Sequence, residues 1–186
     1  TTDTNLTIGG NLVIAEAATP TLSTGAGTAG NVTVTGTTNG TTGGAAESLT
    51  VQAGTGTVTF TGNVGNNTNS TELEALTITN AAATTFSGTV DLANALTQTN
   101  AATGATTFTG AVSVGSADLK GTSYAINNSF ASAGTTAFTN SGVITKSAGT
   151  HITSTGAFST SGDVTLAANI TTTDTNLTIG GNLVIA

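Results

Sequence analysis

The sequence predicts an all-β protein, a parallel β-solenoid of about seven to nine coils with about 20–30 residues in each. Three observations lead to this prediction. Apolar and polar residues alternate in many short runs, a related motif returns once per expected coil, and one string of letters stands at both ends of the chain. Alternation with period two is the pattern of half-buried strands. A regular return of one motif is typical of stacked solenoid coils.

The alternating runs are short and lie between turn residues. Examples are NVTVTG, SLTVQ, TVTFTG, AVSVG and DVTLA. Threonine is the commonest residue, and its stiff, β-branched side chain suits the pleated surface of a strand. Glycine and asparagine tolerate positive φ, so we expect the chain to turn at the Gly and Asn clusters between the runs.

A weak motif marks successive coils: an apolar residue, then Thr or Ser, then Gly, then a further apolar residue. Its marker positions are Ile8, Val34, Phe60, Phe86, Phe108, Phe138, Phe158 and Ile179. The first four markers are equally spaced, whereas the later steps are unequal, and the longest runs from Phe108 to Phe138. A single coil cannot bury its apolar face, whereas stacked coils share one continuous core. The motif therefore predicts stacking.

The phenylalanines of the motif are the expected centre of the core. We predict that they lie inside, either as a stack down one wall or as scattered core residues: Phe60, Phe86, Phe108, Phe138 and Phe158. Offset stacked rings add about 0.5–1.5 kcal/mol per pair beyond area burial.

The string TTDTNLTIGGNLVIA occupies residues 1–15 and again residues 172–186. Its return predicts a single solenoid segment, residues 1–186. The segment consists of one higher-order repeat, residues 1–171, followed by the first part of the next copy, residues 172–186. Seven stacked coils would rise about 34 Å at the spacing of paired strands.

Alternation within the string predicts which of its side chains point into the core. Gly9 and Gly10 are expected to form the bend between two strands. We expect the apolar residues of the two copies to form the repeat junction: Leu6, Ile8, Leu12, Ile14, Leu177, Ile179, Leu183 and Ile185.

The composition excludes several classes of partner. Charged residues are 6% of the chain, the net charge is −7, and arginine is absent. Binding to nucleic acid phosphates needs clusters of Lys and Arg, so no nucleic acid partner is expected. Cysteine is absent, which rules out disulfides. No apolar run approaches the length that spans a bilayer, so no membrane span is expected. The missing initiator methionine indicates a fragment or a processed product.

Few residues are suited to catalysis. His151 is the single imidazole, and Lys120 and Lys146 are expected to be solvated. We therefore predict no enzymatic activity, no catalytic, cofactor-binding or metal-binding residue, and no cofactor. Calcium is the one weak option, since Glu72 and Glu74 would share a face. However, calcium needs six to eight oxygen ligands.

Two further surface features leave alternatives open. Thr-x-Thr recurs along the chain, and stacked Thr pairs on a flat solenoid face would order water and bind ice. The unequal steps argue against ice binding and favour a plain role as solvent-facing strand residues. Tyr124, within the longest step, is the best candidate for an exposed loop that contacts a glycan or a surface.

The run from SLTVQAGTGTVTFTGNVG through TTFTGAVSV to SGDVTLAANI resembles the β-strand repeats of filamentous-haemagglutinin-like bacterial surface proteins. The resemblance covers roughly residues 45–186, in composition and rhythm. It implies a right-handed parallel β-helix, an extracellular location on the cell surface, and a stalk, sheath or fibre.

The expected partners are identical repeats or chains joined end to end, with lateral bundling or contacts to host and cell surfaces. Cell–cell or surface attachment would follow from such contacts. The alternatives are a calcium-dependent surface-layer lattice and an adhesin segment that binds ice or glycans.

Overall fold

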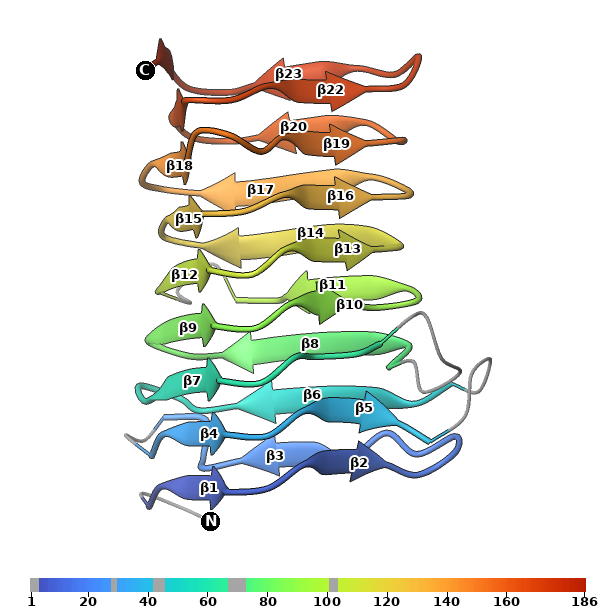
Figure 1. Cartoon of the computed structure of the whole chain (residues 1–186). Coiled ribbons are helices and arrows are strands. Elements are labelled where there is room, and N and C mark those ends of the chain that lie inside the picture. Colours follow the sequence, from blue (N-terminus) through green and yellow to red (C-terminus); the bar gives the residue numbers. More distant parts are fainter. Residues whose placement is uncertain (1–3, 28–29, 42–45, 67–72, 101–103) are drawn as a thin grey trace.

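A computed structural model describes residues 4–27, 30–41, 46–66, 73–100 and 104–186 (Figure 1). Every regular element in these ranges is a β-strand. No helix in them is long and apolar enough to cross a membrane. The strands lie in three parallel sheets, called sheets A, B and C below, that run along the length of the molecule.

Each sheet takes strands from successive coils. Sheet A consists of β1 (Leu6–Ile8), β4 (Val32–Val34), β7 (Thr57–Phe60), β9 (Ala83–Phe86), β12 (Ala105–Phe108), β15 (Tyr124–Ile126), β18 (Ile144–Lys146), β21 (Val164–Leu166) and β24 (Leu183–Ile185). Sheet B consists of β2 (Leu12–Ile14), β5 (Thr38–Gly40), β10 (Val90–Asp91), β13 (Val112–Val114), β16 (Phe130–Ser132), β19 (Ile152–Ser154) and β22 (Ile170–Thr172), with single bridges at Val64 that join β5 to β10. Sheet C consists of β3 (Thr21–Ser23), β6 (Ser48–Gln52), β8 (Ala75–Asn80), β11 (Ala95–Gln98), β14 (Ser116–Gly121), β17 (Thr136–Asn140), β20 (Phe158–Thr160) and β23 (Leu177–Ile179).

The chain visits sheets A, B and C in turn, and each round is one coil. The described strands make eight such rounds, and β24 begins the ninth. In Figure 1 the chain rises from left to right along the nearer sheet B and returns from right to left along the more distant sheet C. This path makes the winding right-handed. The predicted right-handed parallel β-helix is therefore confirmed.

The register of sheet A shows where each coil begins and ends. One inward column runs through Ile8, Val34, Phe60, Phe86, Phe108, Ile126, Lys146, Leu166 and Ile185. Coils are longest between Ile8 and Phe86, all later coils are shorter, and the shortest runs from Phe108 to Ile126. The marker positions expected after Phe108 were wrong, because Phe138 and Phe158 belong to sheet C.

The aromatic side chains form one continuous series through the core. Phe60, Phe86 and Phe108 stack with ring centroids 5.4 and 5.2 Å apart and interplanar angles of 2° and 3°. Phe130 of sheet B meets Phe108 edge-on. It also contacts Phe138, whose ring centroid lies 5.9 Å from that of Phe158. The first three rings make a ladder in sheet A, and the later rings lie across the core from two other sheets.

Glycines at the corners let adjacent coils approach each other closely. One column between sheets A and B consists of Gly10, Gly36, Gly62, Gly88 and Gly110. A Cβ atom added to Gly62 would lie 2.6 Å from the carbonyl carbon of Gly36 in the coil below. Since that obstacle is backbone, it cannot move aside by a change of rotamer.

We predict that Gly62→Ala lowers the free energy of unfolding by about 1–3 kcal/mol through overpacking. Gly9→Ala is the matched control, because a Cβ atom there meets nothing within 4 Å. Denaturant titration of both variants measures the effect. Equal stability of the two variants would contradict the proposed close packing of the corners.

Candidate functional site at the two ends of the solenoid

The first copy of the repeated string forms the N-terminal edge of the solenoid in sheets A and B. Its two strands are β1 in sheet A and β2 in sheet B, joined by the bend at Gly9 and Gly10. Strands β4 and β5 of the second coil cover them in parallel register, with Leu6 opposite Val32 and Leu12 opposite Thr38.

Two asparagines of this copy fasten the second coil to the first. Asn5 Oδ1 accepts a hydrogen bond from the backbone N–H of Asn31 at 2.9 Å. Asn11 Oδ1 accepts from the N–H of Thr37 at 3.0 Å. Both donors lie at corners, directly before a strand begins, so the side chains continue the backbone ladder around the bends.

The second copy of the string lies on different faces. Its first strand, β23, is in sheet C on β20, and its second strand, β24, is in sheet A on β21. Identical sequences therefore turn the corner from A to B at one end and from C to A at the other. Strand β24 lies in the same sheet as β1, eight turns further along the solenoid. Strand β23, the counterpart of β1 in the second copy, comes one third of a turn before β24, in sheet C. The two copies are thus separated by seven and two-thirds turns.

The second copy exposes the edge that the first copy has covered. Leu177 and Leu183 are each 49% exposed, and Ile185 is 70% exposed, whereas its counterpart Ile14 in the first copy is 2% exposed. Asn176 and Asn182 match Asn5 and Asn11 in sequence. No described residue donates a hydrogen bond to their side-chain oxygens. The C-terminal end therefore presents apolar side chains, open strand edges and two side-chain acceptors together.

Tyr124 was expected in an exposed loop and lies in the core instead. It is 2% exposed in β15, and its ring meets that of Phe138 edge-on at 4.8 Å. Burial, assisted by the charge of Asp118, raises the pKa of the Tyr124 hydroxyl. This side chain is therefore not available as an exposed contact for a glycan.

Lys146 was also expected in solvent, and it is 1% exposed. It stands in the inward column of sheet A between Ile126 and Leu166. Its ammonium donates to the carbonyl of Ser147 at 2.9 Å and to the hydroxyl of Thr150 at 2.8 Å. Desolvation lowers the pKa of Lys146, because burial disfavours the charged form.

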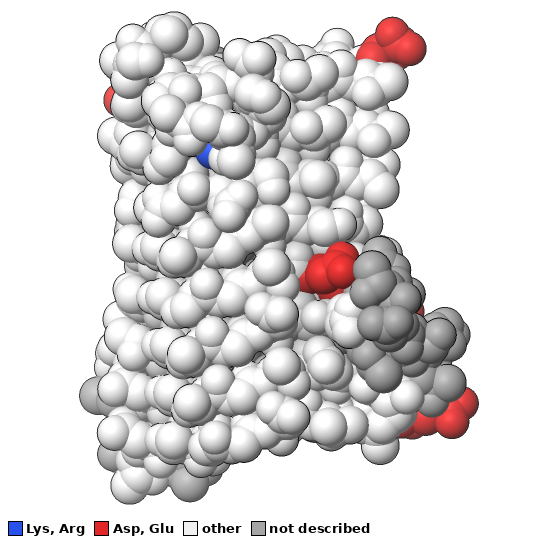
Figure 2. Space-filling model, in the orientation of Figure 1, with Lys and Arg blue, Asp and Glu red and all other residues white. Residues whose placement is uncertain are grey.

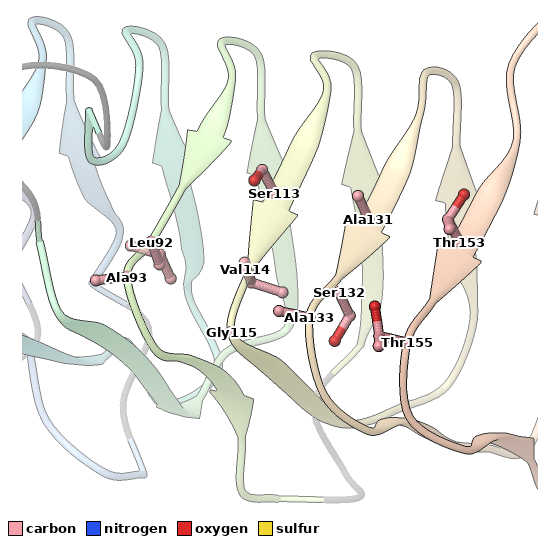
Figure 3. Close-up of a pocket in the computed structure, with 10 residues that line it drawn as sticks. All are labelled: Leu92, Ala93, Ser113, Val114, Gly115, Ala131, Ser132, Ala133, Thr153 and Thr155. Carbon is pink, nitrogen blue, oxygen red and sulfur yellow. The ribbon is translucent and has the colours of Figure 1, made fainter. Parts of the chain in front are cut away.

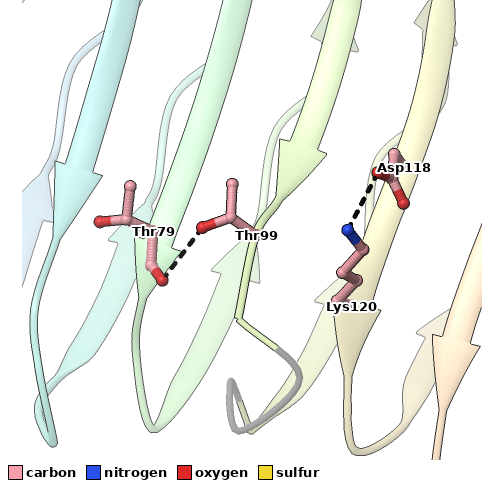
Figure 4. Close-up of polar contacts among 4 residues, drawn as sticks. All are labelled: Thr79, Thr99, Asp118 and Lys120. Carbon is pink, nitrogen blue, oxygen red and sulfur yellow. Dashed lines mark hydrogen bonds and ion pairs between the residues drawn. The ribbon is translucent and has the colours of Figure 1, made fainter.

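Within the described ranges, the remaining ionisable groups do not converge on one site. Asp118 and Lys120 form an ion pair at 3.4 Å on the outer face of sheet C, with side chains 51% and 39% exposed (Figure 4). Such surface pairs contribute little to stability. The nearby Thr99 hydroxyl donates to the carbonyl of Thr79. His151 is exposed.

The weak calcium option finds no support in the described residues. Within those ranges no three His, Cys, Asp or Glu side chains group as metal ligands. Glu72 lies outside them, so the Glu72–Glu74 pair has no structural description.

A shallow groove of about 300 Å³ crosses sheet B and the corner that follows it (Figure 3). It lies between two outward columns, Ser113–Ala131–Thr153 and Gly115–Ala133–Thr155. Alanine and glycine are smaller than the threonines of the coil above, which leaves the hollow. No ionisable side chain lines it.

No family model, curated protein or solved structure matches this chain.

Asparagines were expected at the corners, but sequence reasoning missed the hydrogen bonds that their side chains accept from backbone N–H groups. Four of them each accept a backbone N–H from the coil above: Asn5, Asn11, Asn31 and Asn63. Each stands directly before the first apolar residue of a strand or bridge. The bonds run from side chain to backbone, rather than between amides as in an asparagine ladder.

The repeated string provides a matched pair of variants. Asn11→Ala removes the acceptor of the Thr37 N–H and should lower the free energy of unfolding by about 0.5–1 kcal/mol, the net value of one exposed hydrogen bond. Asn182→Ala changes the same residue in the same string, but no donor is lost, so no change is expected. Denaturant titration distinguishes the two. An equal loss in both variants would mean that the acceptor role has no part in stability.

Stability should also depend on pH through Lys146. Its folded-state pKa lies below the unfolded value of about 10.4. The unfolded chain therefore binds more protons between these values, and the free energy of unfolding rises with pH across that window. Above about pH 10 the raised pKa of Tyr124 acts in the opposite direction.

Denaturant titrations at a series of pH values below this limit measure the effect. The rise should appear in the native chain and in Lys120→Met, and it should be lost in Lys146→Met. A rise that persists in Lys146→Met would contradict the assignment to this side chain.

Proposed function

We propose that this chain is a structural repeat of a long extracellular fibre, stalk or sheath on a bacterial surface. Its role is mechanical, without enzymatic activity, and it holds cells or surfaces together. Its partners are further copies of the same unit, joined end to end. The observation that carries the proposal is the open C-terminal edge of β23 and β24, which repeats the sequence of an edge that a coil covers in the same molecule.

The first copy defines what would cover the second. Strand β4 places Val32 and Val34 on Leu6 and Ile8 of β1, and strand β5 pairs with β2. The same coil donates two backbone N–H groups, to Asn5 and Asn11. Since β23 and β24 have the same residues as β1 and β2, a coil with the sequence of Asn31–Gly40 would make the same contacts there. Covering a half-exposed leucine or isoleucine contributes on the order of 1 kcal/mol each.

The sides of the solenoid also support a mechanical role. Charged side chains are sparse on the face shown in Figure 2, and the groove on sheet B has no ionisable lining residue. The resemblance to filamentous-haemagglutinin-like repeats supports a location outside the cell. In a repeat protein each unit contacts only its neighbours, so length is gained by adding units.

The test is a chain of two repeats, residues 1–186 followed by a second copy of residues 16–186. End-to-end stacking predicts a single rod of about twice the axial length in small-angle scattering, and a higher melting temperature than that of one repeat, because stability grows with each stacked interface. Two bodies that melt at the temperature of one repeat would contradict the proposal.

A junction variant sharpens this test. Ile185→Lys should be neutral in the single repeat, where the side chain is 70% exposed, and destabilising in the double repeat, where it would be covered. Val143→Lys is the control, because Val143 is 40% exposed at a lateral corner and stays exposed in both chains.

Protease treatment of intact source cells tests the location and should degrade the protein from outside.

A further inference from the structure

The outer face of sheet A carries two parallel columns of hydroxyl groups. In the coils of β4, β7, β9 and β12 the columns are formed by Thr33, Thr59, Thr85 and Thr107, and by Thr35, Thr61, Ser87 and Thr109. These eight residues are called the hydroxyl face below. The first column is in strict strand register. The second continues the same ladder, since each of its N–H groups donates to a carbonyl of the coil below.

The unequal steps along the sequence do not disturb this array. The coil from Thr85 to Thr107 is shorter than the coil from Thr59 to Thr85, yet both pairs are register partners. The difference is absorbed elsewhere in the coil and leaves sheet A in register. Coils of unequal length are therefore compatible with a regular threonine surface on this sheet. The number of residues in a coil does not set the distance between paired strands.

The rings behind three of the four coils of the hydroxyl face are nearly parallel. Directly inside this face, Phe60, Phe86 and Phe108 stack with interplanar angles of only 2° and 3°. Sheets normally twist, and stacked side-chain ladders are one of the causes that keep a sheet flat. The nearly parallel rings therefore indicate that the strands carrying Thr59, Thr85 and Thr107 are twisted very little relative to one another.

The hydroxyl groups are available to solvent, and no charged side chain stands among them. None of the eight side chains makes a hydrogen bond to a residue in the described part of the chain. Lys146 is the one Lys, Arg, Asp or Glu in the described strands of sheet A, and it points inward. Those strands also carry no outward aromatic residue. The face therefore lacks the aromatic and arginine anchors that dominate protein interfaces.

We propose that the hydroxyl face binds ordered water and through it the surface of ice. Neighbouring hydroxyls lie about 4.8 Å apart along the axis and about 6.6–7 Å apart along each strand, from the strand spacing and rise. Such a two-dimensional grid holds a layer of waters at fixed positions, as an ice surface does. Threonine rotamers are stiff, and water that bridges polar groups is immobilised at small entropic cost. This function goes beyond the mechanical role and does not depend on it.

The test uses the full chain and ice itself. Purified protein should inhibit ice recrystallisation and partition into slowly growing ice. Thr59→Lys combined with Thr85→Lys places two long charged side chains in the centre of the hydroxyl face and should abolish both properties. Ser113→Lys combined with Thr153→Lys is the control, because both residues are exposed on sheet B, and it should retain them.

Each outcome decides the proposal. Melting curves of both double variants establish that the solenoid remains folded. If the native chain neither inhibits recrystallisation nor enters ice, the proposal is wrong. It is also wrong if the sheet A variant stays active, or if both variants lose activity equally. Lateral association of chains that only the sheet A variant disrupts, without ice activity, would assign the face to a second copy of the chain instead.

Discussion

The pairing of each coil's backbone with the coil above and below is the interaction on which the rest of the structure depends. Side chains are short and mostly uncharged, and the strands of two to six residues are too short to be stable by themselves. Parallel pairing in all three sheets joins them into one body. The inward residues then fall into columns, and the aromatic series from Phe60 to Phe158 becomes continuous. Both proposed functions use the same pairing, at its open end and along its side.

Corners decide how strictly the pairing is kept. Glycine columns let the backbones approach, and side-chain oxygens of Asn31, Asn63 and Asp163 accept the N–H groups that a bend takes out of the ladder. The connection from sheet B to sheet C is long after β2 and β5 and short after β10 and β13. Sheet A keeps its register throughout. This division of roles explains how long and short coils stack in one solenoid.

The fold class could be predicted from the sequence, because period-two alternation and the return of the motif both follow from stacking. The assignment of residues to faces could not. Phe108 and Phe138 fit the same motif, yet the register partner of Phe108 is Ile126, in the run YAI that lacks the motif. Because the coil frame could not be followed past that point, Tyr124 and Lys146 were expected outside. The sequence also did not reveal which sheets each copy of the string joins. The same Gly-Gly-Asn bend forms the corner between sheets A and B in the first copy and between sheets C and A in the second. The junction at the two ends stays a prediction, whereas the hydrogen bonds of the corner asparagines needed the structure.

The central claim is that the two identical strings occupy different faces, seven and two-thirds turns apart. Disulfide formation in the cysteine-free chain tests it most directly, because paired strands bring Cα atoms within disulfide range. Ser159 and Thr178 are register partners in sheet C. The double variant Ser159→Cys with Thr178→Cys should close a disulfide under mild oxidation, and Thr165→Cys with Thr178→Cys should not. Closure of the second pair instead of the first would put both copies of the string on sheet A and contradict the account.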